Sequence, residues 1–383
     1  MWPYGGLDFN TMDLNIIQHA LTYILFSGIG AFIWAPLLIK FLYKHQITRR
    51  GEFDFTLKGG MRNQKVGTPI MGGLLVIVTV TVITVLFNWT RENTYVPIGV
   101  MAIAALLGGA DDLLNIFGRK RRERKLSHIL NLIVVHKKWY MKLWYIFILP
   151  WETFRKTVSM FGSHPGKGIQ VHEKLFFQFL AGALTAWWIY YKLGVQWHSL
   201  WIPFDGSPHV GWWIIPIVIF FVMLTANAVN FADGLDGLVG GSLIITFLGL
   251  MIISWSESRI SFTYLNATVV GALIAYTYFN VKPARFQMGD VGSLGLGALL
   301  AINAIAINRT LLIPFLGFIF YVEVISVFIQ IFCRRLLGKR FFKMAPLHHH
   351  FEFKNWSEEK IVMRFWLIHG FFVIIAVWMS LHK

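Results

Sequence analysis

Aspartate residues stand at two places where they could bind a cation, and a solvated helix end is the alternative for the adjacent pair. Asp111 and Asp112 are adjacent at the end of an apolar run, and Asp290 lies in the segment GDVGS at 289–293. Neighbouring carboxylates repel each other, and a divalent cation or a proton relieves that repulsion. Asp290 either caps the helix that follows it or holds a metal, while exposed N–H groups of that helix receive phosphate oxygens.

Amide and carboxylate side chains recur every three residues in the segment NAVNFADGLDGL at 227–238. They are Asn227, Asn230, Asp233 and Asp236. This spacing places neighbours along one stripe of a helix or along a 3₁₀ turn. Such oxygens suit a polar headgroup or hydrated Mg²⁺, whereas a helix cap would explain one of the four but not all of them.

Two further segments point to anion binding. KVGTPIMGG at 65–73 carries one cation, Lys65, among glycines, but it lacks the spacing of a P-loop. PLHHHFE at 346–352 contains three consecutive histidines in a predicted loop. Consecutive loop residues cannot all converge easily on one zinc ion. Imidazoles that donate to phosphate oxygens are therefore the better interpretation.

Apolar helices must position these residues. Of 383 residues, 56% are hydrophobic and 14% charged, with a mean hydropathy of +0.58, whereas soluble domains carry about a quarter charged residues. The apolar blocks have roughly the 17–25 residues that a bilayer crossing needs. We predict one all-α, polytopic membrane domain over 1–383. Its ten spans would be 17–43, 70–89, 95–110, 174–193, 211–227, 238–254, 263–280, 291–307, 311–333 and 361–381.

The basic residues indicate the orientation of the chain. Of the 35 Lys and Arg residues, 30 share one side of the membrane if both termini lie outside. The positive-inside rule makes that side cytoplasmic. The net charge of +16 then belongs to cytoplasmic loops, which argues against a nucleic-acid partner. Every polar motif above falls on the same cytoplasmic side, with Asp111 and Asp112 at the end of the third span.

The segment 119–166 does not fit this plan of ten spans. It begins with a basic run at 119–125 and becomes aromatic and apolar up to Trp151. An eleventh span there would move every later motif to the opposite side from Asp111 and Asp112. We predict an insertion that lies in the cytoplasmic interface of the membrane, with a re-entrant or partner-binding hairpin as the alternative.

The order of the motifs resembles that in the polyprenyl-phosphate N-acetylhexosamine-1-phosphate transferases, and within them the phospho-N-acetylmuramoyl-pentapeptide transferases. The matching segments are KVGTPIMGG, DD at 111–112, KGIQVHEK at 167–174, NAVNFADGLDGL, MGDVGSL at 288–294 and PLHHHFE. PLHHHFE is the most specific of these, because sister transferases carry a different His pattern there. Ten spans with both termini periplasmic is also the topology of the family.

The resemblance implies an Mg²⁺-dependent enzyme of the bacterial inner membrane that makes lipid I for peptidoglycan. UDP-N-acetylmuramoyl-pentapeptide would be the donor, undecaprenyl phosphate the acceptor and UMP the leaving product. Asp111, Asp112 and Asp290 become the catalytic carboxylates, with Asp290 as the first candidate for the Mg²⁺ ligand and Asp112 as the second. Substrate-binding residues would be Lys65, Thr68, Lys174, Asn227, Asn230, Asp233, Asp236, Asn280, His348, His349 and His350. A homodimer embedded in membrane lipid is the assembly to consider.

The chain departs from the family pattern in three places. Asn115 stands where a Lys often follows the DD pair, and Gln287 stands where many members have Phe. An aromatic platform for uracil is then absent or supplied elsewhere. The insertion 119–166 has no counterpart.

The implied reaction is attack by the polyprenyl phosphate on the β-phosphorus of the UDP-sugar, with Asp111 or Asp112 accepting a proton. A two-step route through an aspartyl-phosphate is the open alternative. The nearest rival function is a sister transferase that uses UDP-N-acetylglucosamine. The rival from another class is an anion transporter, which would place polar groups at the bilayer midplane within internal repeats.

Overall fold

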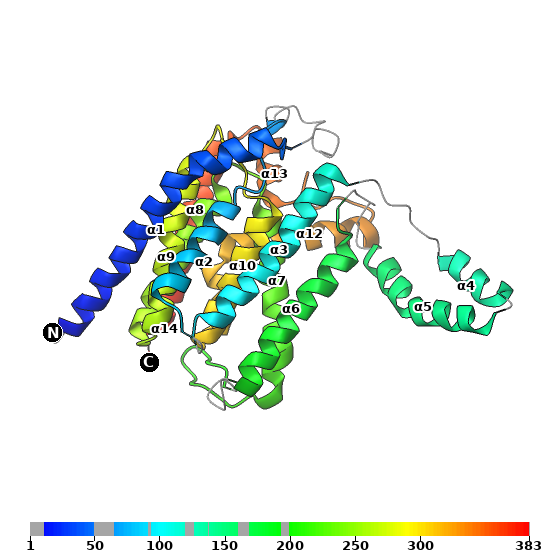
Figure 1. Cartoon of the computed structure of the whole chain (residues 1–383), viewed down its shortest axis with the longest axis horizontal. Helices are drawn as coiled ribbons and strands as arrows, with labels where there is room; N and C mark the ends of the chain where they lie inside the picture. Colours follow the sequence, from blue (N-terminus) through cyan, green and yellow to red (C-terminus); the bar gives the residue numbers. More distant parts are fainter. Residues whose placement is uncertain are drawn as a thin grey trace.

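The computed structural model describes residues 11–49, 65–90, 93–118, 126–136, 138–159, 168–192 and 199–382. Within these ranges the chain is helical, with isolated β-bridges and no named strand. Most helices lie side by side in one bundle, and α4 and α5 project away from it (Figure 1). The predicted all-α class is confirmed.

The bundle is built from long and short helices. Its long members are α1 (Thr11–Lys44), α2 (Leu74–Phe87), α3 (Tyr95–Phe117), α6 (Val171–Lys192), α7 (Ile214–Ala232), α8 (Leu238–Ser256), α9 (Ile260–Asn280), α10 (Gly289–Ala306), α12 (Phe318–Leu336) and α14 (Glu358–Leu381). The short members are η5 (Gly211–Trp213), η6 (Thr310–Leu312), α11 (Ile313–Leu316) and α13 (Leu347–Phe353). The segment PLHHHFE, predicted as a loop, therefore lies mostly in helix α13.

Each predicted span corresponds to one of these helices, but fewer satisfy the length and apolarity of a crossing. In the described part of the chain seven helices do so, and η6 and α11 together with α12 form an eighth candidate that is bent by 83°. α2 has only 14 residues, and α6 is not among the seven. The polytopic membrane architecture is supported, while the number ten remains a prediction.

The start of α1 and the end of α14 lie at the same end of the bundle, and α13 lies at the other (Figure 1). This arrangement agrees with two termini on one side of a membrane. A lipid environment also explains why the helices dominate, because lipid offers the backbone no hydrogen-bond partners.

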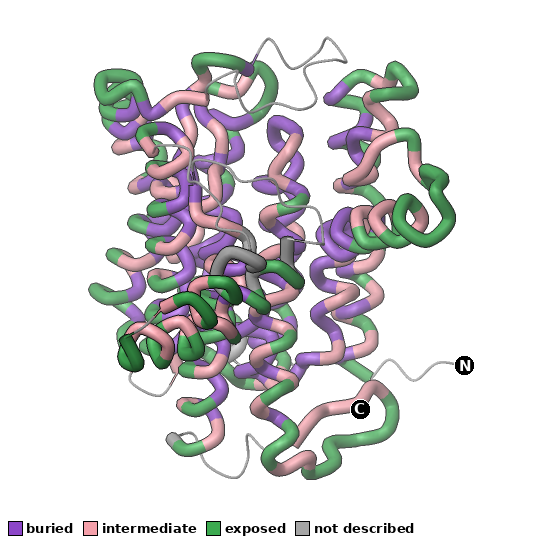
Figure 2. Tube along the Cα trace, turned by 90° about the vertical axis from the view of Figure 1, so that its right-hand side faces the viewer, coloured by how far each residue is buried: buried purple, intermediate pink, exposed green. Residues whose placement is uncertain are grey.

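α10 forms the centre of the bundle and packs against α3 and α7. All of its residues from Val291 to Ala306 are buried, and Figure 2 shows buried positions concentrated in the interior of the bundle. Gly108 on α3 permits this packing, since a Cβ there would lie 2.1 Å from the carbonyl oxygen of Asp290. The close crossing brings the segments DD and GDVGS into contact.

The third span continues beyond its predicted end at residue 110. α3 runs to Phe117, so Asp111 and Asp112 lie inside the helix rather than at its solvated end. Both are buried, with 2% and 5% exposure. The prediction was wrong on this boundary because each carboxylate finds partners on neighbouring segments, which removes the cost of keeping it in the helix.

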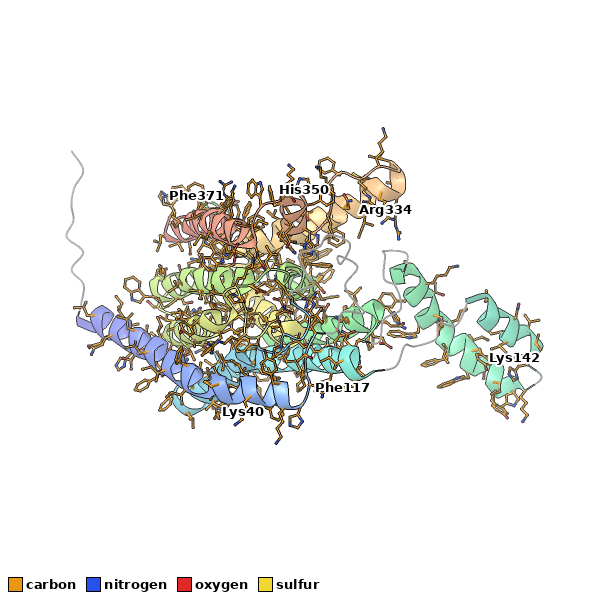
Figure 3. The ribbon with its side chains drawn as sticks, turned by 90° about the horizontal axis from the view of Figure 1, so that it is seen from above. Lys40, Phe117, Lys142, Arg334, His350 and Phe371 are labelled. Atoms are coloured by element: carbon orange, nitrogen blue, oxygen red, sulfur yellow. The ribbon has the colours of Figure 1, made fainter. Side chains whose placement is uncertain are left out.

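The insertion contains α4 (Leu126–Val135) and α5 (Trp139–Ser159). Neither helix is among the candidate spans, and Figure 3 shows Lys142 of α5 far from the bundle that carries Phe371. Trp151 joins α5 to α6, with its ring 5.3 Å from those of His172 and Phe176. Residues 119–125, 137 and 160–166 of this predicted insertion lie outside the described residues.

Candidate active site

Four helices meet at one end of the bundle and bring together the residues that we call the aspartate cluster. α3 and α7 end there, whereas α6 and α10 begin there. The cluster comprises Asp111, Asp112, Asp233 and Asp290 with Lys174 and Asn230. The ammonium of Lys174 lies 2.6 Å from Asp111 Oδ2 and 2.5 Å from Asp290 Oδ2. Asn230 donates to Asp290 Oδ1 at 2.8 Å.

Asp112 and Asp233 hold the backbone at the start of α10. Asp112 accepts the N–H groups of Asp290 and Val291 at 3.2 and 3.1 Å. Asp233 accepts the N–H of Gly289 at 3.1 Å. These donors are therefore already used by carboxylates, which contradicts the expectation that they receive phosphate oxygens. The side chain of Asp290 does not cap its own helix, because it points to Lys174 and Asn230.

Gly289 is required by this arrangement. Its φ of +72° lies in the left-handed region that favours glycine, and a Cβ would approach Asp112 Oδ2 to 2.7 Å. A side chain at 289 would thus separate α3 from the start of α10. Gly289 therefore allows Asp112 to reach the backbone N–H groups at the start of α10.

The carboxyl group of Asp233 has a pKa above the usual range of an aspartate. Burial raises its pKa to about 7, and the negative charge of Asp290 adds to the effect. A group with such a pKa can exchange a proton near neutral pH. Asp233 follows the last residue of α7, so it reaches the cluster from a turn.

A second lysine forms a separate ionic group, which we call the Lys65 cluster. It comprises Lys65, Asp236 and Glu358. Lys65 Nζ lies 2.8 Å from Asp236 Oδ1 and 2.5 Å from Glu358 Oε1. The same Glu358 oxygen accepts the N–H of Asp236 at 2.7 Å. Sequence reasoning missed Glu358, because an acidic residue that follows Ser357 at a helix start is typical of an ordinary helix cap.

Two predicted binding residues support the backbone instead of facing a cavity. Asn280 accepts the N–H of Gly237 at 2.9 Å and donates to the carbonyl of Phe286 at 2.9 Å. Asn227 donates to the backbone carbonyl of Met223 and to Gln178 Oε1, each at 2.7 Å. Thr68 is half-buried, and its carbonyl accepts the N–H of Arg49 at 3.0 Å.

The three histidines lie on α13, and two of them, His348 and His349, have acidic partners. His348 Nδ1 lies 3.2 Å from Glu323 of α12, and its Nε2 lies 3.2 Å from Nε2 of His349. His349 is hydrogen-bonded to Glu352. His350 accepts the N–H of Lys343 at 3.2 Å. No group of three or more Asp, Glu, His or Cys side chains in the described ranges has the geometry of a complete metal site.

Comparisons with known proteins match this chain over most of its length. Residues 166–308 match the family described as Glycosyl transferase family 4. A phospho-N-acetylmuramoyl-pentapeptide-transferase of Levilactobacillus brevis is 31% identical to this chain, and the aligned region covers 94% of this chain and 99% of that protein. The protein of that name from Chloroflexus aurantiacus is 34% identical, with coverages of 90% and 84%. The one from Latilactobacillus sakei is 31% identical, with coverages of 91% and 94%.

The chain belongs to the phospho-N-acetylmuramoyl-pentapeptide transferase family. Identity of this extent over nearly the whole of both chains confirms the resemblance drawn from the motifs.

Two residues that depart from the pattern of these transferases occupy defined places in the site. Asn115 donates to Asp111 Oδ2 at 3.0 Å. Gln287 accepts a hydrogen bond from Arg49 Nη1 at 3.1 Å. The neighbouring Phe286 is fully buried against Tyr276, with ring centroids 5.3 Å apart. Phe286 therefore cannot serve as a replacement aromatic platform without leaving the core.

A polar cavity of about 280 Å³ lies beside the aspartate cluster of this transferase. Sequence reasoning missed Arg49, which comes from the segment after α1 and is the one basic residue among the described residues that line this cavity. No motif marks Arg49, since basic residues are common in cytoplasmic loops. The lining residues are Thr48, Arg49, Ile70, Asp112, Asn115, Ile116, Asp233, Gln287, Gly289 and Asp290.

Proposed function

We propose that this chain transfers phospho-N-acetylmuramoyl-pentapeptide from its UDP-linked donor to undecaprenyl phosphate, and that it releases UMP. The aspartate cluster carries the proposal, because residues from α3, α6, α7 and α10 converge on one polar site beside a cavity. The names of the related proteins supply the donor sugar.

The site is proposed to face the cytoplasm at the edge of the inner membrane. The acceptor keeps its chain in lipid and its phosphate at the surface, while the UDP donor is soluble. A site at the ends of spans reaches both substrates. The excess of basic residues on one side supports the cytoplasmic assignment. The insertion would lie at the same surface, where the exposed aromatic residues Trp139, Trp144 and Phe147 of α5 suit the interface.

Mg²⁺ fits the donor set of the cluster. Asp111 and Asp290 already share one cationic partner, the Lys174 ammonium, so their oxygens are close enough to share a small ion. Mg²⁺ needs only one or two carboxylates, because it keeps several waters. We propose Asp290 and Asp111 as its holders. Asp112, the second candidate from the sequence, has both oxygens occupied by backbone N–H groups. When bound, Mg²⁺ would neutralise charge on the diphosphate.

The side chains of the site would neutralise charge and accept a proton. Lys174 and Arg49 supply positive potential for two anionic substrates, whose mutual repulsion opposes the reaction. Asp111 is our candidate base of the adjacent pair, because its Oδ2 contacts only side chains, those of Lys174 and Asn115, whereas both oxygens of Asp112 accept backbone N–H groups at the start of α10. Asp233 is a second candidate, given its pKa near neutrality. Positioning and electrostatics supply most of the acceleration in phosphoryl transfer.

The decisive experiment is UMP release by the purified protein with undecaprenyl phosphate and Mg²⁺. We expect turnover with UDP-N-acetylmuramoyl-pentapeptide and little with UDP-N-acetylglucosamine. The reverse preference would assign the chain to a sister transferase. Incubation with labelled donor in the absence of acceptor tests the mechanism, since a labelled protein would favour the aspartyl-phosphate route.

A further inference from the structure

Helices α4 and α5, which we call the hairpin, present an exposed apolar surface. They leave the bundle sideways, close to the end of α3 and the start of α6 (Figure 1). Phe147 is 78% exposed and Trp139 is 73% exposed. A soluble monomer seldom leaves so many large apolar side chains in contact with water, so this surface has a partner. Exposed residues of the hairpin include Val134, Trp139, Leu143, Trp144, Ile146 and Phe147.

Basic residues accompany this apolar surface. Lys142 lies on α5 and Lys138 lies directly before it. The segment 119–156 contains 11 Lys and Arg residues but only two Asp and Glu residues. Basic helices with Trp, Phe and Leu on an apolar face bind surfaces of anionic lipid, and each basic residue near such a surface strengthens binding roughly five-fold. The charge of the hairpin therefore favours anionic phospholipid as its partner.

The position of the hairpin favours the same partner. Its helices follow α3, which is long and apolar enough to cross a membrane. The hairpin is therefore held beside the bilayer at all times, and this tethering gives the lipid surface a high effective concentration. A soluble protein, which is the competing partner, has no such advantage.

The hairpin contacts the first turns of α6, which carry a member of the aspartate cluster. The ring of Trp151 on α5 meets those of His172 and Phe176 edge to face, with centroids 5.3 Å apart in each pair. His172 is buried, and Lys174 follows two residues later with its ammonium 2.6 Å from Asp111 Oδ2. The hairpin thus supports the helical turn that holds Lys174.

The segment directly before α6 is also tied to the aspartate cluster. The N–H of Ile169 donates to Asp111 Oδ1 at 2.5 Å. A Cβ on Gly168 would lie 2.4 Å from Asn115 Oδ1, so the backbone passes close to the site at this point. A displacement of the start of α6 would therefore alter two contacts of Asp111, one with Lys174 and one with Ile169.

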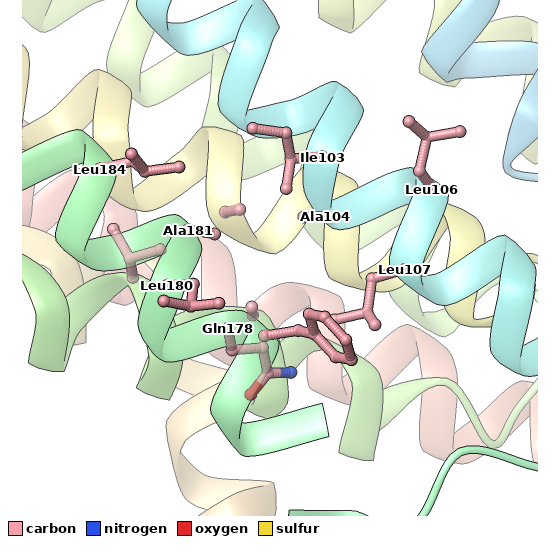
Figure 4. A pocket seen from close by; sticks show the side chains of 12 residues that line it. Ile103, Ala104, Leu106, Leu107, Gln178, Leu180, Ala181 and Leu184 are labelled. Carbon is pink, nitrogen blue, oxygen red and sulfur yellow. The ribbon is translucent and has the colours of Figure 1, made fainter. Parts of the chain in front are cut away.

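The bundle supports α6 on one side more than on the other. α6 packs along α7, but toward α3 it borders an apolar cavity of about 420 Å³, with Gln178 and Ala181 among its lining residues (Figure 4). Protein interiors are otherwise close-packed. Because side chains do not fill this space, the position of the start of α6 depends more strongly on its contact with α5.

We propose that the hairpin docks on a membrane surface that contains anionic phospholipid, and that the docked hairpin holds the start of α6, and with it Lys174, in the aspartate cluster. Trp151 is the positioning residue of this coupling. The docking does not rest on the proposed function, whereas its effect on UMP release does.

A fluorescent probe on α5 tests the docking in the full-length protein in nanodiscs. Ile146→Cys carries the probe in a Cys333→Ser background, since Cys333 is the only cysteine of the chain. In nanodiscs with phosphatidylglycerol, nitroxide-labelled phospholipid is expected to quench the probe, whereas iodide in the buffer is not. In phosphatidylcholine alone, quenching by lipid should be weaker.

Two results of the probe experiment would overturn the docking. Quenching by iodide but not by lipid would place the probe in water and leave the hairpin to a soluble partner. Equal quenching by lipid in both kinds of nanodisc would remove the requirement for anionic headgroups.

A charge reversal tests the role of the basic residues. Lys138→Glu combined with Lys142→Glu is expected to abolish the difference in lipid quenching between the two nanodiscs. Lys339→Glu combined with Arg340→Glu is the matched control, because it changes the charge equally at exposed positions after α12. The control should keep the difference. An equal loss in the control would overturn the proposal, because the effect would then come from the charge of the whole protein.

Hydrogen exchange at the amide of Ile169 tests the coupling without substrates. Exchange in the wild type is expected to be slower with phosphatidylglycerol than with phosphatidylcholine alone. Trp151→Ala should remove this difference while lipid still quenches the probe at 146, and Trp151→Phe should restore it. Exchange that is independent of lipid in the wild type, or a difference that persists in Trp151→Ala, would overturn the coupling.

UMP release separates this inference from the proposed function. The wild type is expected to turn over faster in nanodiscs with phosphatidylglycerol than in phosphatidylcholine alone, and Trp151→Ala should lose this dependence. Turnover that does not depend on lipid in the wild type would overturn the effect of docking on Lys174. Absence of UMP release from a wild type with the expected quenching and exchange would instead reject the proposed function.

Discussion

The aspartate cluster and the Lys65 cluster use the same local chemistry, in which one ammonium lies between two carboxylates. Lys174 links α6 to α3 and α10, and its partner Asp290 lines the polar cavity. Lys65 links the segment before α2 to the turn after α7 and to the start of α14. The Lys65 side chain is 11% exposed and that of Lys174 is 21% exposed.

The difference lies in what else the carboxylates hold. Glu358 also accepts the backbone N–H of Asp236, and Lys65 is within 3.4 Å of the carbonyl of Gly234, so this group fastens a turn. In the aspartate cluster, Asp111 likewise accepts a backbone N–H, that of Ile169, but the Asp290 carboxylate is held by two side chains, Lys174 and Asn230. The two ion pairs therefore differ in their surroundings, because Asp290 lines the polar cavity whereas Glu358 holds a turn.

The largest expected effect is that of Asp290→Asn. We expect the rate of UMP release to fall by on the order of 1000-fold, because charge stabilisation at the diphosphate is lost. Lys174 keeps Asp111 as a partner, so the protein should still purify as a folded species. A rate within a few-fold of wild type would reject Asp290 as a catalytic residue.

Lys174→Met should lower turnover on the order of 100-fold and yet strengthen the binding of a divalent cation about ten-fold. Lys174 occupies the position of the cation between two carboxylates, and its removal relieves that competition by more than about 1 kcal/mol. Titration with Mn²⁺, followed by electron paramagnetic resonance without substrates, measures the affinity. Lys174→Arg keeps the charge and should show no gain. If Lys65→Met produced the same gain, the two clusters would not differ as described.

Glu358→Gln should act on stability more than on chemistry. Removal of one buried partner of Lys65 is expected to cost about 2 kcal/mol, and thermal unfolding should begin about 5 °C lower. UMP release at saturating substrates should stay within about three-fold of wild type. A loss of turnover comparable to that of Asp290→Asn would place the Lys65 cluster in the catalytic machinery.

Lys282→Met is expected to have the smallest effect. Lys282 lies 3.6 Å from Glu358 and 2.9 Å from Glu359, but its side chain is 34% exposed. Exposed pairs contribute from about zero to 1 kcal/mol. The unfolding temperature should therefore change much less than in Glu358→Gln, and a larger change would extend the Lys65 cluster to include Lys282.

The motifs predicted the cluster better than they predicted individual roles. Asp111, Asp233 and Asp290 are far apart in the chain, but each marks a span end on the same side, so their meeting follows from topology. Arg49 and Glu358 carry no motif, and their contribution depends on packing between segments 200 to 300 residues apart. Asn280 lies beside the motifs but makes backbone contacts, a role that no residue type reveals.

The sequence alone determined the class of protein, its membrane helices and the family, because apolar block length, charge asymmetry and ordered motifs are local properties of the chain. Only the tertiary structure decided how far α3 extends, which carboxylate each lysine contacts, and that Asp112 holds the start of α10. These features depend on helix crossings such as that at Gly108, where distances of a few ångströms decide which groups can form a hydrogen bond. The cavity between α3 and α6 likewise arises from four alanines on four helices, which become neighbours only in the folded bundle.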